Sequence, residues 1–92
     1  ATGTTQATAL LLINGINVLG TVASGTGVAL YPANPGTSQT VYNGGANPVT
    51  VYPPLGSKIN QIAVNGGHLL ATNTSCVYFN ATATQVIANL SA

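Results

Sequence analysis

The sequence has almost no charged side chains. Its 92 residues include no Asp, Glu or Arg, and its only basic side chains are one lysine, Lys58, and one histidine, His68. Glycoside hydrolysis and much of general acid–base catalysis use carboxylates, and a Ser-His-Asp triad would lack its third member. We therefore expect a protein that is not an enzyme and that uses no cofactor.

The same scarcity bears on metals and nucleic acids. One His and one Cys cannot build a zinc site within a single chain, and one Lys cannot supply the several phosphate contacts of a nucleic-acid complex. We expect no metal and no direct nucleic-acid ligand, and we interpret Lys58 as a solvated or interface residue. For His68 the ordinary interpretation is a half-exposed side chain beside Gly66-Gly67. The alternative is that three copies meet on a trimer axis and bind a metal or an anion.

Cysteine and long apolar runs are also scarce. Cys76 has no second cysteine to pair with, and its position between Ser75 and Val77 favours a small buried residue over an intermolecular disulfide. The longest apolar run, residues 9–13, is far shorter than the roughly 20 residues that span a bilayer. No basic residue precedes this run, so the pattern of a signal peptide is missing. We expect neither membrane contact nor a targeting segment.

Apolar and small polar residues make up most of the chain. Hydrophobic residues account for 46%, which argues against intrinsic disorder, because disorder goes with low hydrophobicity and high charge. A net charge near zero favours association, so the composition suits a protein that works in an assembly. We divide the chain into a flexible polar arm, residues 1–6, and a single β domain, residues 7–92.

Alternating apolar and polar residues between turn signals predict an all-β fold without a helix. The segment 59–64 fits either a short strand or one helical turn. About eight strands at short spacing predict a small antiparallel β-sandwich or barrel. The expected strands are residues 7–13, 17–23, 28–31, 38–42, 49–52, 68–72, 75–80 and 84–90.

The middle of the chain predicts a β-hairpin. Residues 38–42 and 49–52 alternate in the manner of strands, and the glycine turn between them tolerates positive φ. Two prolines after the second strand remove backbone donors, so that pairing must stop there. The turn residues that we expect to shape this region are Asn43, Gly44, Gly45, Pro53 and Gly56.

The run YNGGANPVTVYPPLGSKIN also carries a resemblance. With the apolar segment 62–65 and a Cys-x-Tyr near the end, it resembles small all-β virion structural proteins of tailed bacteriophages, over roughly residues 13–80. Lys58 departs from the small polar residues typical of those proteins at that position. The positions that carry the resemblance are Asn43, Gly45, Ala46, Asn47, Val49, Val51, Tyr52, Pro53, Gly56, Ile59, Asn60, Ile62, Cys76 and Tyr78.

The resemblance implies a capsid decoration (cement) protein. Such a protein binds the outer surface of a phage head, its partner is the major capsid protein, and it is assembled in the host cytoplasm before it resides on the virion exterior. The alternative is a receptor- or glycan-binding module of a phage tail fibre or spike, with sugars stacked on tyrosine rings. Its candidates are Tyr31, Tyr42, Tyr52 and Tyr78.

Strand alternation assigns side chains to two faces. The inner set is predicted to comprise Val41, Val49, Val51, Val77 and Phe79, and the outer set Tyr42, Tyr52 and Tyr78. Three tyrosine rings on one uncharged surface indicate an interface rather than a solvated face. We therefore expect a homotrimer in which these three tyrosines form the subunit or capsid interface.

Overall fold

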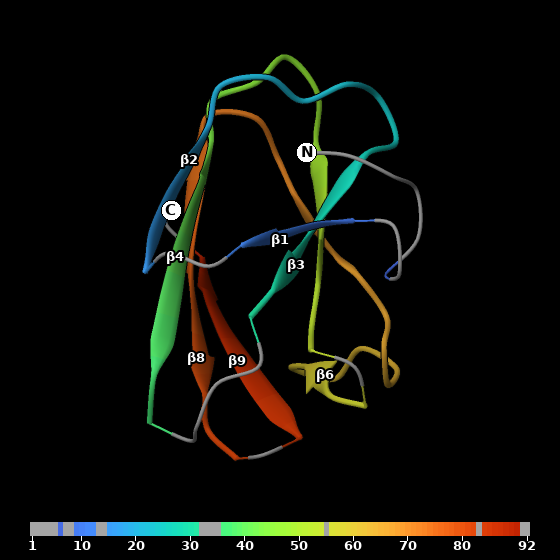
Figure 1. Ribbon diagram of the computed structural model, residues 1–92, viewed down its shortest axis with the longest axis vertical. Helices are drawn as coiled ribbons and strands as arrows, with labels where there is room; N and C mark the ends of the chain where they lie inside the picture. Colours follow the sequence, from blue (N-terminus) through green and yellow to red (C-terminus); the bar gives the residue numbers. More distant parts are fainter. Residues whose placement is uncertain are drawn as a thin grey trace.

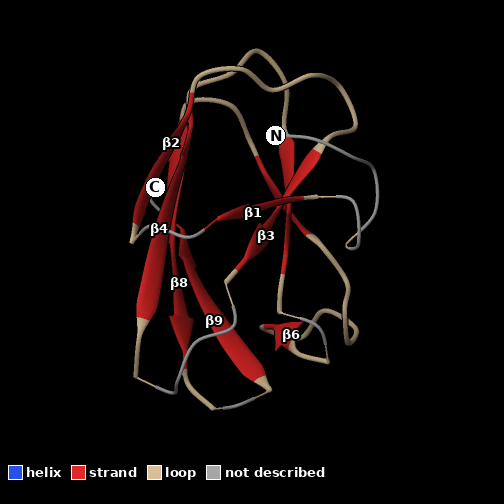
Figure 2. Ribbon diagram, viewed as in Figure 1, coloured by secondary structure: helices blue, strands red, loops and turns tan. Residues whose placement is uncertain are grey.

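The described residues form nine strands in two sheets, which pack as a β-sandwich (Figure 1). The computed structural model describes residues 6, 9–12, 15–31, 36–54, 56–82 and 84–90, and no helix occurs among them (Figure 2). The all-β prediction is confirmed. One sheet has the strand order β1-β3-β5-β7 and the other β2-β4-β8-β9-β6. The strands are β1 (Leu10–Leu12), β2 (Ile16–Leu19), β3 (Gly27–Leu30), β4 (Ser38–Asn43), β5 (Val49–Tyr52), β6 (Lys58–Ile59), β7 (His68–Leu70), β8 (Thr74–Asn80) and β9 (Gln85–Leu90).

The chain changes sheet at each connection from β1 to β8. As a result β1, β3 and β5 lie side by side and parallel, with Leu10, Val28 and Val51 in one row. β2 and β4 are parallel in the other sheet, where Asn17 lies opposite Val41. The first five strands thus alternate between the two sheets. In Figure 1, β1 crosses in front of β3.

Two predictions about strand pairing are wrong. The sheets are mixed rather than antiparallel, since four pairings are parallel and three antiparallel. The predicted central hairpin does not exist: β4 lies between β2 and β8, whereas β5 lies between β3 and β7 in the other sheet. Residues 44–48 therefore cross from one sheet to the other instead of turning within one.

The predicted positions of the strands along the chain agree with the structure better than the predicted pairing does. β5 has the predicted bounds, and the ambiguous segment 59–64 begins in β6 and continues as a turn at Asn60, whose φ is 50°. β1 lies within the predicted strand 7–13, of which residues 7, 8 and 13 are outside the described part. Gln6, the last residue of the predicted arm, donates through Nε2 to Pro53 O at 2.8 Å. Residues 1–5 of that arm also lie outside the described part.

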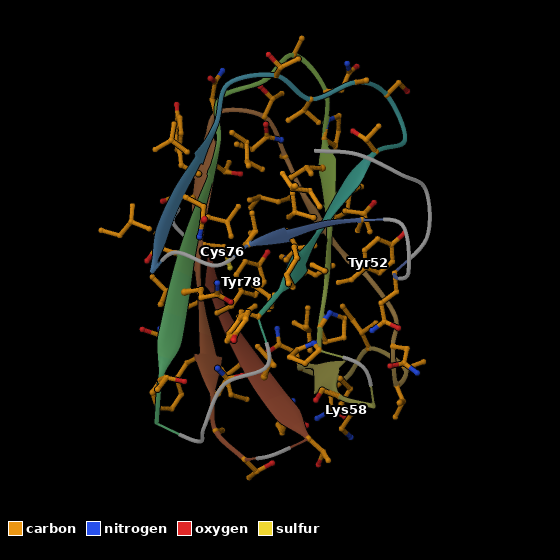
Figure 3. All side chains as sticks on the ribbon, viewed as in Figure 1. Tyr52, Lys58, Cys76 and Tyr78 are labelled. Atoms are coloured by element: carbon orange, nitrogen blue, oxygen red, sulfur yellow. The ribbon has the colours of Figure 1, made fainter. Side chains whose placement is uncertain are left out.

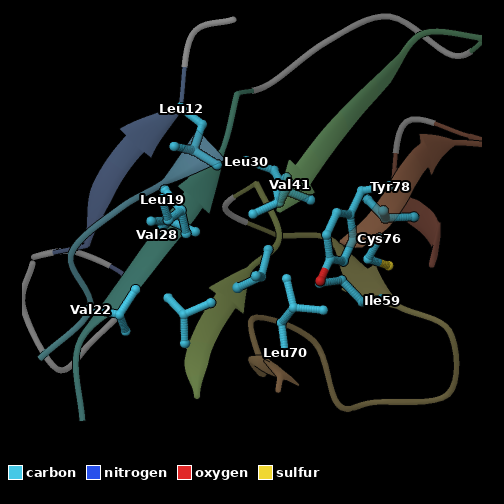
Figure 4. Packing of buried hydrophobic residues seen from close by; sticks show 13 residues of the cluster. Leu12, Leu19, Val22, Val28, Leu30, Val41, Ile59, Leu70, Cys76 and Tyr78 are labelled. Carbon is cyan, nitrogen blue, oxygen red and sulfur yellow. The ribbon is translucent and has the colours of Figure 1, made fainter. Parts of the chain in front are cut away.

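The core lies between the two sheets (Figure 4). Val41, Val49 and Val51 are completely buried, as predicted. Full burial of one aliphatic side chain of this kind contributes about 1.5–3 kcal/mol, so the inner faces hold the sheets together. The buried apolar cluster consists of Leu12, Leu19, Val22, Val28, Leu30, Val41, Val49, Val51, Ile59, Leu70, Cys76, Tyr78 and Val86.

The predicted faces of β8 are inverted. Cys76 and Tyr78 are 1% exposed and belong to the core, whereas Val77 and Phe79 are 39% and 42% exposed. The hydroxyl of Tyr78 lies 2.8 Å from Nδ1 of His68, and the two rings meet edge to face with centroids 5.7 Å apart. Because this hydroxyl has a partner inside, the ring is buried without an unpaired polar atom.

Candidate interaction surface

The outer face of the five-stranded sheet exposes several large hydrophobic residues among small polar ones. Ile16 and Val18 on β2 are 74% and 70% exposed, and Tyr42 on β4 is 37% exposed. We call this surface the apolar face. Its large hydrophobic residues are Ile16, Val18, Tyr42, Val77, Phe79 and Ile87.

The strand register places two pairs of these side chains next to each other. Val18 lies directly beside Tyr42, and Phe79 lies beside Ile87. Neighbouring strands are about 4.8 Å apart, so these pairs touch across the sheet. Among the described residues of this face none is charged, since the lysine is half-buried on β6. An exposed apolar surface of this kind is typical of a contact site.

The three tyrosines do not share a surface, and Figure 3 shows Tyr52 and Tyr78 apart from each other. Tyr42 belongs to the apolar face, whereas Tyr52 is half-buried on the outer side of the other sheet, because it alternates with Val51. There its ring lies against Gly27, where an added Cβ would come within 2.7 Å of it. Tyr78 lies between the sheets. The prediction of one outer aromatic set is therefore wrong, and it missed Ile16 and Val18.

Asn43 has a structural role at the crossing between the sheets. Its side chain is completely buried. Nδ2 donates to Asn47 O at 2.9 Å and to Leu70 O at 3.1 Å, and Oδ1 accepts from Gly45 N at 3.0 Å. One amide thus joins the end of β4, the crossing segment and the end of β7.

The rest of the crossing segment is fixed just as closely. Asn47 Nδ2 donates to Val22 O at 2.9 Å, and Thr72 Oγ1 donates to Gly45 O at 2.7 Å. Gly45 fits because an added Cβ would lie 2.7 Å from the side chain of Val22. Gly44 donates its N–H to Leu19 O at 2.8 Å. The predicted turn residues therefore connect two sheets rather than two strands of one hairpin.

The second predicted turn follows β5. Gly56 adopts a φ of 84°, which favours glycine. Its N–H donates to Asn65 Oδ1 at 2.6 Å, and Ser57 N donates to Pro54 O at 2.9 Å. Pro53 accepts the hydrogen bond from Gln6 at its carbonyl. These contacts close the loop between β5 and β6.

His68 and Tyr78 form a polar contact across the sandwich. Burial lowers the pKa of His68, so the imidazole is neutral at pH 7. Burial, followed by the neighbouring Cys76, raises the pKa of Tyr78. Burial also raises the pKa of the Cys76 thiol, which disfavours the reactive thiolate. No group of three His, Cys, Asp or Glu gathers in the described part of the chain.

A groove of about 270 Å³ lies between β1 and β2. These are the edge strands of the two sheets on the same side of the sandwich. Leu10 and Leu11 are 45% and 48% exposed there. The groove is lined by Leu10, Leu11, Leu12, Ile16, Asn17, Val18 and Leu19.

Comparison of the chain with protein-family models, with curated proteins and with solved structures finds no match. A search of the described residues for helices long and apolar enough to cross a membrane also finds none.

Proposed function

We propose that this protein is a decoration (cement) protein that binds the outer surface of a bacteriophage head and stabilises the contacts between major capsid proteins. The observation that carries the proposal is the apolar face, whose exposed hydrophobic side chains come from four neighbouring strands, β2, β4, β8 and β9. A rigid sheet that presents apolar side chains without charge suits permanent contact with another protein. The resemblance of the central segment to phage virion proteins supports the choice of partner.

The mechanism of stabilisation is burial of area across a joint. One subunit that contacts two neighbouring capsid proteins resists their separation when packaged DNA presses outward. With one lysine and no acidic side chain, the protein gains little from ion pairs, so apolar burial of about 25 cal/mol per Å² provides the attraction. Shape and apolar fit then select the site on the shell.

The tail-fibre alternative has less support. It relied on tyrosine rings available to stack on sugars, but Tyr78 is in the core and Tyr42 and Tyr52 face opposite sides. The homotrimer was predicted from three rings on one surface. These rings are distributed over two outer faces and the core, so that argument no longer supports a trimer.

The test is to mix the purified protein with undecorated phage heads and to image the particles. We expect regular added density on the wild-type particles. Phe79→Asp, on the apolar face, should abolish it, because a carboxylate would be buried without a partner. The matched control is Leu69→Asp, which places the same charge at a 65% exposed position on the opposite sheet. Undecorated particles with wild-type protein would contradict the proposal, as would equal loss with both variants.

A further inference from the structure

The outer edge of β2 has backbone hydrogen-bonding groups that no other described strand uses. β2 ends the five-stranded sheet, and no other described strand pairs with it on the side away from β4. Gly15 O and Leu19 O accept from Thr40 N at 2.7 Å and from Gly44 N at 2.8 Å, so these residues point toward β4. Because backbone groups alternate along a strand, the N–H and C=O groups of Ile16 and Val18 point outward.

This edge has none of the usual protection against pairing. Natural edge strands are guarded by charge, proline, bulges or short length. β6, at the opposite end of the same sheet, has two residues, one of them Lys58. β2 has four residues and no charge, and Ile16 and Val18 are the most exposed large hydrophobic residues in the described part of the chain.

We propose that β2 is a dimerisation strand, which pairs antiparallel with β2 of a second copy about a two-fold axis at Asn17. Ile16 of each copy then lies opposite Val18 of the other. Each such pair exchanges two N–H to C=O bonds, and the five-stranded sheets join into one continuous sheet. On the apolar face the Ile16 and Val18 side chains form cross-strand contacts.

A second copy fits this edge better than a charged partner. Identical strands in antiparallel alignment are self-complementary in hydrogen bonding, and two-fold pairing is the commonest form of self-association. No lysine, arginine or carboxylate side chain lies at this edge to repel a second copy, because the single lysine lies on β6 at the far end of the sheet. The neighbouring groove supplies further apolar area from Leu10 and Leu11.

The area required is modest for this molecule. A stable interface takes about 800 Å² from each partner, which is roughly one sixth of the accessible surface of 4790 Å². The edge of β2 adjoins both the groove between β1 and β2 and the part of the apolar face that β2 forms. The interface proposed here needs no capsid protein, so it stands or falls independently of the proposed function.

The first experiment measures the mass of the free protein by light scattering and sedimentation. We expect a wild-type dimer. Val18→Pro removes an N–H that points away from β4, and it should raise the dissociation constant of the dimer by about tenfold or more. Val18→Thr keeps the backbone donor and should remain dimeric.

A second control is Phe79→Asp, two strands away on the same face, which should also remain dimeric. A wild-type monomer or trimer overturns the proposal, as does a dimer that Phe79→Asp dissociates and Val18→Pro does not.

The second experiment tests the register without relying on proline. Directly opposed residues that exchange both bonds have Cα atoms about 5.5 Å apart, within disulfide range. Ile16→Cys mixed with Val18→Cys should therefore cross-link between copies under mild oxidation, more than either variant does by itself. The native Cys76 is buried and does not compete. Equal cross-linking in the mixture and in each single variant would overturn the proposed register.

Discussion

The two faces of the five-stranded sheet differ although neighbouring residues of the same strands form them. On β8, Tyr78 points inward with its hydroxyl beside His68, whereas Phe79 points outward and is 42% exposed. On β4, Asn43 is completely buried beside the exposed Tyr42. On β8 and at the end of β4, hydrophobicity alone therefore did not decide which residue lies inside. At these positions the inner residue is one whose polar atoms find partners between the sheets.

The polar side-chain atoms on the inner face have hydrogen-bond partners. Gln39 accepts from Tyr31 N at 2.9 Å and donates to Leu12 O at 2.8 Å, and Asn80 Nδ2 donates to Thr37 Oγ1 at 3.2 Å. No buried side-chain N or O of the described residues lacks a partner. In a chain almost without charge, these neutral contacts fix one arrangement of the sheets, and the outer face is left to apolar contacts.

The largest difference in stability between the two faces should appear when a buried asparagine is replaced. Asn43→Ala removes three hydrogen bonds and leaves Gly45 N–H and two carbonyls unpaired in a buried site. Each such group costs about 1–3 kcal/mol, so we expect a loss of roughly 3–5 kcal/mol in the free energy of unfolding. Urea denaturation measures it.

The matched control is Asn89→Ala, at an exposed position of β9, where the change should stay within about 0.5 kcal/mol. If both variants lost the same stability, the buried network around Asn43 would not be what holds the crossing between the sheets.

A smaller difference should appear with tyrosine. Tyr78→Phe keeps the ring but removes the hydroxyl next to His68 Nδ1, which leaves a half-buried imidazole nitrogen without this partner. We expect a loss of about 1–2 kcal/mol. Tyr42→Phe, on the apolar face, should change the free energy of unfolding by less than about 0.5 kcal/mol. A larger effect at Tyr42 than at Tyr78 would reverse our assignment of the two faces.

The sequence predicted where strands lie but not how they pair. β-branched runs and turn residues are local signals, which is why β5 was located with its bounds. Whether residues 44–48 turn within a sheet or cross between sheets depends on contacts far away in the chain. Asn47 bonds to Val22 O, and Gly45 packs against the Val22 side chain. No pattern within the segment indicates these partners.

The candidate surface was predicted only in part. Alternation divided β8 into two sets of residues, but Val77 and Phe79 are the more apolar set and were assigned to the core. The reverse choice depends on His68 of β7 being available to the Tyr78 hydroxyl, which is a tertiary contact. Tyr42 was identified as outward-facing, whereas Ile16 lay outside the predicted strand 17–23 and Val18 was assigned to neither face.

The smallest effect that we predict is a dependence of stability on pH through His68, whose ring contacts Tyr78 on the inner face. Burial lowers its pKa in the folded protein, so between that pKa and about 6.5 the unfolded chain binds more protons. Stability therefore decreases as pH falls from 7.5 through about 6.5, and it levels off below the folded pKa. The chain has no acidic side chain to obscure this titration.

Thermal unfolding from about pH 8 to pH 5 should show a lower melting temperature in acid for the wild type and a nearly flat profile for His68→Gln. A wild-type melting temperature that rises on acidification would mean that protonated His68 is favoured by the fold, against the burial described here.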